Sequence, residues 1–60
     1  RRAPKTARRA YEKACDRGDA KACARLAYMH QRGLGGDPSQ RLAKAFTERA
    51  CKMGHQQSCR

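Results

Sequence analysis

The chain has 60 residues, carries a formal net charge of +10 at pH 7, and contains 38% hydrophobic but only 5% aromatic residues. A domain this small buries only about 60% of the surface that its unfolded chain exposes, and the scarcity of large apolar side chains excludes the multilayer core of an enzyme. Its apolar stretches fall far short of the roughly 20 residues that cross a bilayer, and no N-terminal segment has the pattern of a signal peptide. We therefore expect stabilisation beyond core packing, from disulfides, a metal or neighbouring segments.

An internal repeat with a period of 36 residues organises the chain. This shift places the segment 12–18, Glu-Lys-Ala-Cys-Asp-Arg-Gly, on the segment 48–54, Glu-Arg-Ala-Cys-Lys-Met-Gly, and it places Cys23 on Cys59. We expect one domain over residues 1–60, with a first repeat at about 3–38 and a partial second repeat at about 39–60. Because the chain begins with two arginines rather than Met and stops inside its second repeat, we also expect a longer parent protein.

The first predicted helix runs from Pro4, which suits a first turn, to Gly18, which suits a left-handed C-terminal cap. One face carries an apolar stripe at helical spacing, formed by Ala7, Ala10, Tyr11 and Ala14. The other side carries a basic residue at every fourth position, joined by Arg2 and Arg8. We define the basic face as Arg1, Lys5, Arg8, Arg9, Lys13 and Arg17.

A second helix is predicted from a cap at Asp19 to Gly33, where a glycine loop at 33–36 begins. Its apolar stripe comprises Cys23, Leu26, Ala27 and His30. The tight connection at residues 17–19 makes the first two helices an antiparallel hairpin.

A third helix is predicted after the loop, with either Asp37 or Ser39 as its N-cap, Pro38 in its first turn and Gly54 at its end. Its stripe repeats that of the first helix and comprises Ala43, Phe46, Thr47 and Ala50. Residues 55–60 should begin a fourth helix that the chain does not complete.

The four cysteines stand symmetrically about the two predicted turns. Cys15 and Cys23 each lie four positions from Asp19, and Cys51 and Cys59 stand the same way about the second turn. Residues equidistant from a tight helix turn meet across it, near the Cα separation of a disulfide. We predict the bridges Cys15–Cys23 and Cys51–Cys59, each worth roughly 2.5 kcal/mol by loop entropy. Free thiols and zinc are the alternatives, although the spacing lacks the close cysteine pairs of structural zinc sites.

Such bridges predict an oxidising compartment, so we expect a secreted or periplasmic protein.

The run Tyr-Glu-Lys-Ala-Cys-Asp-Arg-Gly-Asp-Ala-Lys-Ala-Cys at 11–23, followed by Leu26, Met29, Gly33 and Gly35, resembles the Sel-one-like repeat family. It is similar in particular to the bacterial cysteine-rich members. The resemblance implies an all-α fold of antiparallel α/α hairpin repeats, a solenoid fragment related to tetratricopeptide arrays, with a disulfide across each helix pair. It also implies a scaffold or adaptor that binds proteins or peptides, and some cysteine-rich members are labelled penicillin-binding or β-lactamase.

Catalysis is not expected from these residues. A serine β-lactamase needs a Lys three positions after its Ser, and neither Ser39 nor Ser58 has one. His30 falls on an apolar stripe and should be packed, whereas His55 at a turn should be a cap or solvated. The glycine loop lacks the preceding strand and the Gly-Lys-Ser/Thr of a phosphate-binding loop. We predict no catalytic residue, no metal and no cofactor.

The basic face has three possible interpretations: a solvated surface, a contact with an acidic protein or peptide, and a binding surface for nucleic acid or an anionic surface. Against nucleic acid, Tyr11 and Phe46 fall on apolar stripes, so no stacking platform is visible.

An apolar contact surface is predicted at Leu26, Met29, Leu42 and Phe46. Leu42 and Phe46 should pack toward the second helix, but an incomplete fourth helix leaves part of the third uncovered. We expect a further repeat, a second copy or another protein to cover it. The predicted function is a protein- or peptide-interaction module. The alternatives are a nucleic-acid- or anionic-surface-binding domain and, by family label alone, a penicillin-binding or β-lactamase-like protein.

Overall fold

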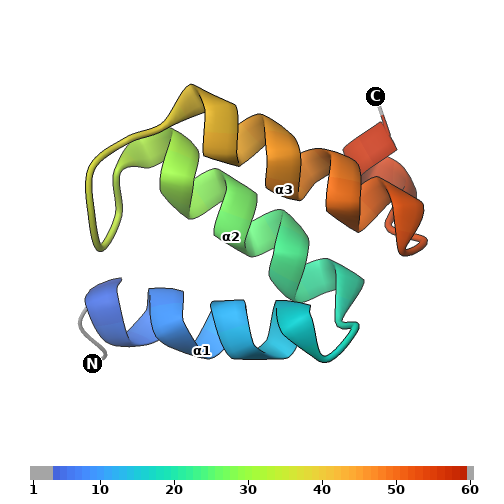
Figure 1. Ribbon diagram of the computed structural model, residues 1–60, viewed down its shortest axis with the longest axis horizontal. Coiled ribbons are helices and arrows are strands. Elements are labelled where there is room, and N and C mark those ends of the chain that lie inside the picture. The colour runs from blue at the N-terminus through green and yellow to red at the C-terminus, as the bar shows by residue number, and fades with distance from the viewer. Residues whose placement is uncertain (1–3, 60) are drawn as a thin grey trace.

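The computed structural model describes residues 4–59, and all regular structure in this range is helical. The elements are α1 (Pro4–Asp16), α2 (Ala20–Arg32), α3 (Gln40–Lys52) and a short 3-10 helix, η1 (Gln56–Cys59). α2 lies between α1 and α3 and runs antiparallel to both (Figure 1). The predicted all-α fold of antiparallel helix hairpins is therefore confirmed. None of the helices in residues 4–59 combines the length and the apolar character that a transmembrane span requires.

α1 and α3 end in the same way, as the 36-residue repeat predicts. Gly18 has a φ of 103° and Gly54 a φ of 107°, a conformation that costs glycine little because it has no Cβ. The amide of Gly18 bonds to the carbonyl of Cys15 at 3.0 Å, and the amide of Asp19 bonds to that of Ala14 at 3.0 Å. The equivalent amides of the second repeat make the same two bonds at 3.0 and 2.9 Å. Each helix thus ends in a Schellman motif that turns the chain sharply.

The two repeats differ after this turn, at Asp19 and its counterpart His55. The Asp19 carboxylate accepts a hydrogen bond from the Ala22 amide at 3.2 Å, which caps α2, and its carbonyl accepts the first helical bond from Cys23. His55 instead pairs its Nδ1 with Ser58 Oγ at 2.7 Å, and its carbonyl accepts from the Ser58 amide. That bond spans three residues rather than four, so the short helix that forms where a fourth helix is predicted to begin is a 3-10 helix over residues 56–59.

Of the two candidate caps for α3, the structure selects Ser39. Its hydroxyl accepts a hydrogen bond from the Leu42 amide at 3.2 Å. Its own amide donates to the carbonyl of His30 at 2.8 Å, which holds Ser39 in extended backbone at the end of the loop. Pro38 consequently precedes the cap, and its predicted place in the first turn of α3 is wrong.

The core forms around the first disulfide. Its fully buried members are Cys15, Ala22, Cys23, Leu26 and Ala50, and the partly buried side chains packed against them are Tyr11, Ala14, Ala24, Phe46 and Met53. Cys15 and Cys23 are 1% and 0% exposed, so their bridge takes the place of large apolar side chains that the sequence does not contain.

Both predicted disulfides are present and use all four cysteines. The Cα atoms of Cys15 and Cys23 are 4.7 Å apart, and those of Cys51 and Cys59 are 4.8 Å apart. The two bridges have different surroundings: the first is in the core, whereas Cys51 is half-buried and Cys59 exposed. The first bridge therefore belongs to the packing of all three helices, and the second joins η1 to the end of α3.

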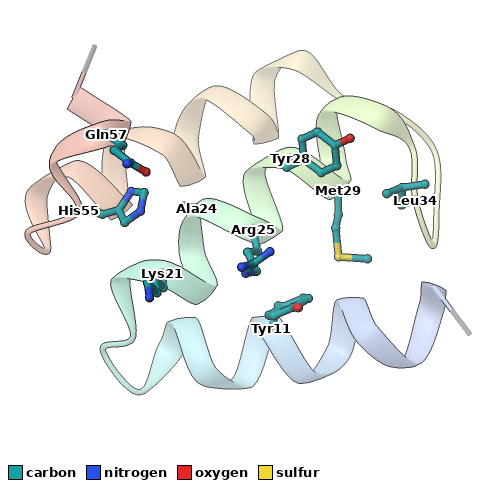
Figure 2. A pocket seen from close by; sticks show the side chains of 9 residues that line it. All are labelled: Tyr11, Lys21, Ala24, Arg25, Tyr28, Met29, Leu34, His55 and Gln57. Atoms are coloured by element: carbon teal, nitrogen blue, oxygen red, sulfur yellow. The ribbon is translucent and has the colours of Figure 1, made fainter. Parts of the chain in front are cut away.

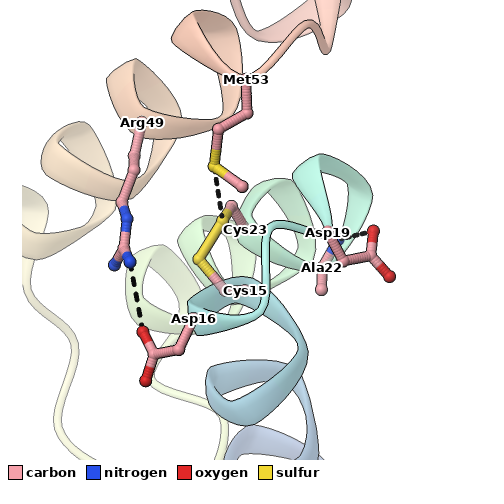
Figure 3. The surroundings of a disulfide bond; sticks show 7 residues. All are labelled: Cys15, Asp16, Asp19, Ala22, Cys23, Arg49 and Met53. Atoms are coloured by element: carbon pink, nitrogen blue, oxygen red, sulfur yellow. Dashed lines mark hydrogen bonds and ion pairs between the residues drawn. A yellow bond between two sulfur atoms is a disulfide. The ribbon is translucent and has the colours of Figure 1, made fainter.

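Two contacts hold α3 to the α1–α2 hairpin at this end of the molecule (Figure 3). The thioether sulfur of Met53 lies 3.6 Å from Cys23 Sγ, which is a packing contact because a disulfide sulfur carries no hydrogen to donate. Arg49 forms an ion pair with Asp16 at 3.2 Å. Both side chains of that pair are exposed, so it contributes at most about 1 kcal/mol.

Candidate protein-interaction surfaces

The first candidate surface is a groove of about 490 Å³ to which α1, α2, η1 and the loop after α2 all contribute (Figure 2). Its lining consists of Tyr11, Lys21, Ala24, Arg25, Tyr28, Met29, Leu34, His55 and Gln57. We call it the α2 groove, because most of its lining comes from that helix. It forms because the turn after α3 places His55 and Gln57 opposite the exposed face of α2, while Tyr11 of α1 closes another side.

The side chains of the α2 groove combine apolar surface with positive charge. Tyr28 is 52% exposed and Leu34 is 40% exposed, and both of these large hydrophobic side chains line the same groove. Lys21 and Arg25 are exposed at the same groove, one helical turn apart. The guanidinium of Arg32 lies 5.4 Å from the centroid of the Tyr28 ring, within range of a cation–π interaction.

The α2 groove was not predicted from the sequence, although the spacing of residues on α2 indicates an exposed mixed face. Lys21, Arg25, Tyr28 and Arg32 recur at i, i+4, i+7 and i+11, which places them on one exposed face of the helix. The predictions for α2 were based on its buried apolar stripe, so this exposed face was not identified.

Only part of the predicted basic face is exposed to solvent. Lys5, Arg9 and Lys13 are exposed on α1, Arg17 is exposed in the turn that follows it, and Arg1 lies outside the described residues. Arg8 does not belong to the basic face: it is half-buried, and its Nη2 donates a hydrogen bond to the carbonyl of Met29 at 3.3 Å. It turns inward because the end of α2 offers a carbonyl and the loop at Gly36 leaves space, since a Cβ there would lie 2.5 Å from Arg8 Nη1.

His30 is buried as predicted, at 5% exposure, and its ring stacks on Phe46 with a centroid separation of 5.3 Å and an angle of 4°. Its Nδ1 has no hydrogen-bond partner within residues 4–59. Burial lowers the pKa of His30 below its ordinary value of 6.5, and the nearby charge of Arg8 lowers it further, whereas Glu12 acts in the opposite direction. His30 is therefore held as a neutral packing residue.

The predicted apolar contact surface is corrected by the structure. Leu26 is 0% exposed and Met29 is 6% exposed, because α1 and α3 cover α2 from both sides, so Leu26 offers no surface to a partner. Met29 contributes only to the floor of the α2 groove. Phe46 packs toward α2 as predicted, half-buried against His30, whereas Leu42 is 41% exposed.

A second hollow, of about 630 Å³, lies on α3 and η1 beside the exposed disulfide. Ala43, Thr47 and Cys51 contribute to it, and the 36-residue shift relates them to Ala7, Tyr11 and Cys15 on α1. α2 covers the equivalent side of α1. This α3 hollow is therefore the position at which the repeat symmetry would seat a further helix.

Comparison with known proteins identifies the repeat. The family model of the Sel1 repeat matches residues 2–19 and 20–55, so one unit of the match spans α2, α3 and the turn that follows. The nearer similarity to bacterial members stays a prediction.

Two curated relatives come from frogs. The chain is 39% identical over 54 residues to cytochrome c oxidase assembly factor 7 of Xenopus tropicalis, and 40% identical over 55 residues to cytochrome c oxidase assembly factor 7A of Xenopus laevis. The alignments cover 88% and 90% of this chain but 23% and 24% of the relatives, so the chain spans about a quarter of their length. No solved structure matches the chain. On the family match and these identities, the chain belongs to the Sel1 repeat family.

Proposed function

We propose that the chain is a non-catalytic protein-interaction module of a helical-repeat protein that assists the assembly of a protein complex. The observation that carries this proposal is the α2 groove, where Tyr28 and Leu34 remain exposed on a doubly bridged scaffold. Sel1 repeats generally mediate protein interactions, and the two relatives are assembly factors by name. Assembly requires recognition of another protein rather than bond chemistry, which suits such a surface.

The two disulfides support this role physically. Each closes a short loop and so lowers the conformational entropy of the unfolded chain. A surface held in one conformation loses less entropy when a partner binds, so more of the contact energy appears as affinity. We further propose that the chain works in an oxidising compartment, in which such bridges persist.

We also propose that the α3 hollow is covered by a further repeat. Its counterpart on α1 is covered by α2, and the relatives are about four times as long as this chain. A repeat buries its apolar face only against a neighbour.

The experiment is a binding assay with the oxidised 60-residue chain immobilised and extracts of its source cells passed over it at moderate salt. We expect one or a few proteins to be retained reproducibly, and each purified candidate to bind the chain directly at micromolar or lower concentration. Hydrolysis of a chromogenic cephalosporin, the activity that the family label implies, should not exceed background. Direct binding by no purified candidate, or measurable hydrolysis, would contradict the proposal.

A second candidate function, binding to nucleic acid, is favoured by the net charge of +10 and by the exposed basic residues of α1. Phosphate contacts release counterions, so such binding would weaken steeply as salt rises. Charge reversal at Lys5, Arg9 and Lys13 together should then abolish binding to duplex DNA. Persistent binding to a protein partner by this triple variant would leave the first proposal in place.

A further inference from the structure

We propose that the α2 groove binds a peptide segment of a partner protein in which acidic residues adjoin a large apolar side chain. This inference rests on the proposed interaction function and specifies the chemistry of its partner. Three properties of the groove carry it: the apolar surface at one end, the cations at the other, and the absence of acidic residues from the described lining.

The apolar end of the groove lies where α2 runs into the following loop. Met29 and Leu34 lie beside each other there, with Tyr28 above them (Figure 2). Tyr28 and Leu34 are two of the three large hydrophobic side chains exposed in the described residues. Their position around the floor formed by Met29 makes a site for one large apolar side chain. Burial of such a side chain there is favourable, because it supplies roughly 25 cal/mol for each Å² of apolar surface removed from water.

The cationic end of the groove lies toward the start of α2. Lys21 and Arg25 are separated by one helical turn, about 6 Å along the axis, and neither forms an ion pair within residues 4–59. His55, which precedes η1, and Gln57 of η1 lie on the opposite side (Figure 2) and can donate hydrogen bonds. Two cations without an ion pair, beside two further hydrogen-bond donors, fit carboxylates spaced along a peptide, with Arg25 able to bind one in bidentate geometry.

Acidic groups of the chain itself do not occupy this site. α2 itself carries no carboxylate, and the carboxylate of its N-cap Asp19 accepts a hydrogen bond from the Ala22 amide; Asp19 lines an adjoining hollow to which Lys21 and Arg25 also contribute. The net charge of +10 adds a long-range attraction for an acidic segment, which speeds its encounter with the groove.

Nucleic acid fits the α2 groove less well. Only Lys21 and Arg25 bring formal positive charge to its lining, and its floor is apolar. The basic residues Arg9 and Lys13 line a different hollow, one that also includes Phe46 of α3. A phosphate backbone that followed the basic residues of α1 would therefore lie outside the α2 groove.

The test uses a fluorescent synthetic peptide in which a run of glutamates precedes a leucine–phenylalanine pair. Two matched probes replace the glutamates by glutamines or the apolar pair by serines, and a fluorescent duplex DNA serves as the fourth probe. We expect the parent peptide to bind the oxidised chain at least about tenfold more tightly than either matched peptide, since each loses one of the two contributions. Equal binding of the three peptides, or preferential binding of DNA with competition against the peptide, would overturn the proposal.

Variants then locate the site. Arg25→Glu and Tyr28→Ala change exposed side chains of the groove and should each weaken binding of the parent peptide by about tenfold. Arg41→Glu makes the same charge change on an exposed residue of α3 outside the groove and should alter binding by less than about threefold. Circular dichroism melts of all three variants verify that the fold is retained. Similar losses of affinity from Arg25→Glu and Arg41→Glu would show that binding depends on net charge alone, which would contradict the assignment of the binding site to the α2 groove.

The same variants separate this inference from the proposed function. If a purified partner protein binds the unaltered chain and the Arg25→Glu and Tyr28→Ala variants equally, the interaction function stands and the α2 groove is not its site. If neither the peptide nor any purified protein binds, both proposals fall.

Discussion

The ring of Phe46 on α3 lies flat against the imidazole of His30 on α2, with centroids 5.3 Å apart and planes 4° from parallel. Because His30 is also 5% exposed, its neutral form is the one that suits this site. The stack is one of the few aromatic contacts available to a chain with three aromatic residues, and it joins the last turn of α2 to the middle of α3.

The stability of the fold should therefore fall as the pH drops below 6.5. Burial lowers the pKa of His30 in the folded state, so the unfolded chain binds this proton more tightly. Stability is complete above the unfolded value of 6.5 and declines as the pH falls toward the lowered folded value, at up to about 1.4 kcal/mol per pH unit for one proton. Urea unfolding at a series of pH values between about 5 and 8, the range in which histidine titrates, measures how the free energy of unfolding depends on pH. His30→Gln should flatten it, and a slope retained by that variant but lost in the matched control His55→Gln would contradict the assignment.

The two disulfides should differ in accessibility and in contribution to stability. Cys59 is exposed, whereas Cys15 and Cys23 are buried. Limited reduction followed by alkylation should label Cys51 and Cys59 first. Replacing Cys15 and Cys23 by Ala should cost about 3–5 kcal/mol, because the bridge and core packing are lost together, against about 2 kcal/mol for Cys51 and Cys59. Earlier labelling of the buried pair would contradict this order.

The N-cap of the first repeat can be removed, and a cap can be added to the second. Asp19→Ala removes the acceptor of the Ala22 amide and should destabilise the fold by about 1 kcal/mol. His55→Asp gives the second repeat the residue that caps α2 and should raise helical content and stability slightly. Circular dichroism at 222 nm and thermal melts measure both changes. A loss of helix in His55→Asp would show that the Ser58 contact of His55 matters more than the missing cap.

Substitutions at Phe46 and Leu42 should have different effects on stability, although both residues lie on α3. Phe46 packs against the core and His30, so Phe46→Asp should cost about 2–4 kcal/mol and unfold much of the chain. Leu42 is 41% exposed, so Leu42→Asp should leave the melt nearly unchanged. If the exposed side of α3 binds a second copy, Leu42→Asp should also reduce association in sedimentation experiments. A folded Phe46→Asp variant would show that the stack contributes little.

The sequence alone determined the three α-helices, the glycine ends of α1 and α3 and the disulfide pairing, because local interactions control each of them. At Gly18 and Gly54 the helices end through backbone bonds to residues three or five positions away, and the cysteines meet because each pair flanks one tight turn. The apolar stripe of α2 likewise predicted burial of Leu26 and His30 correctly.

Only the tertiary structure decided the cap of α3, the direction of Arg8 and the α2 groove. Ser39 is chosen over Asp37 by a hydrogen bond to the carbonyl of His30 across the loop. Arg8 leaves the basic face because a carbonyl at the end of α2 is within its reach. The groove requires η1 to return beside α2, and such contacts between distant segments depend on how the helices pack, which no local pattern in the sequence specifies.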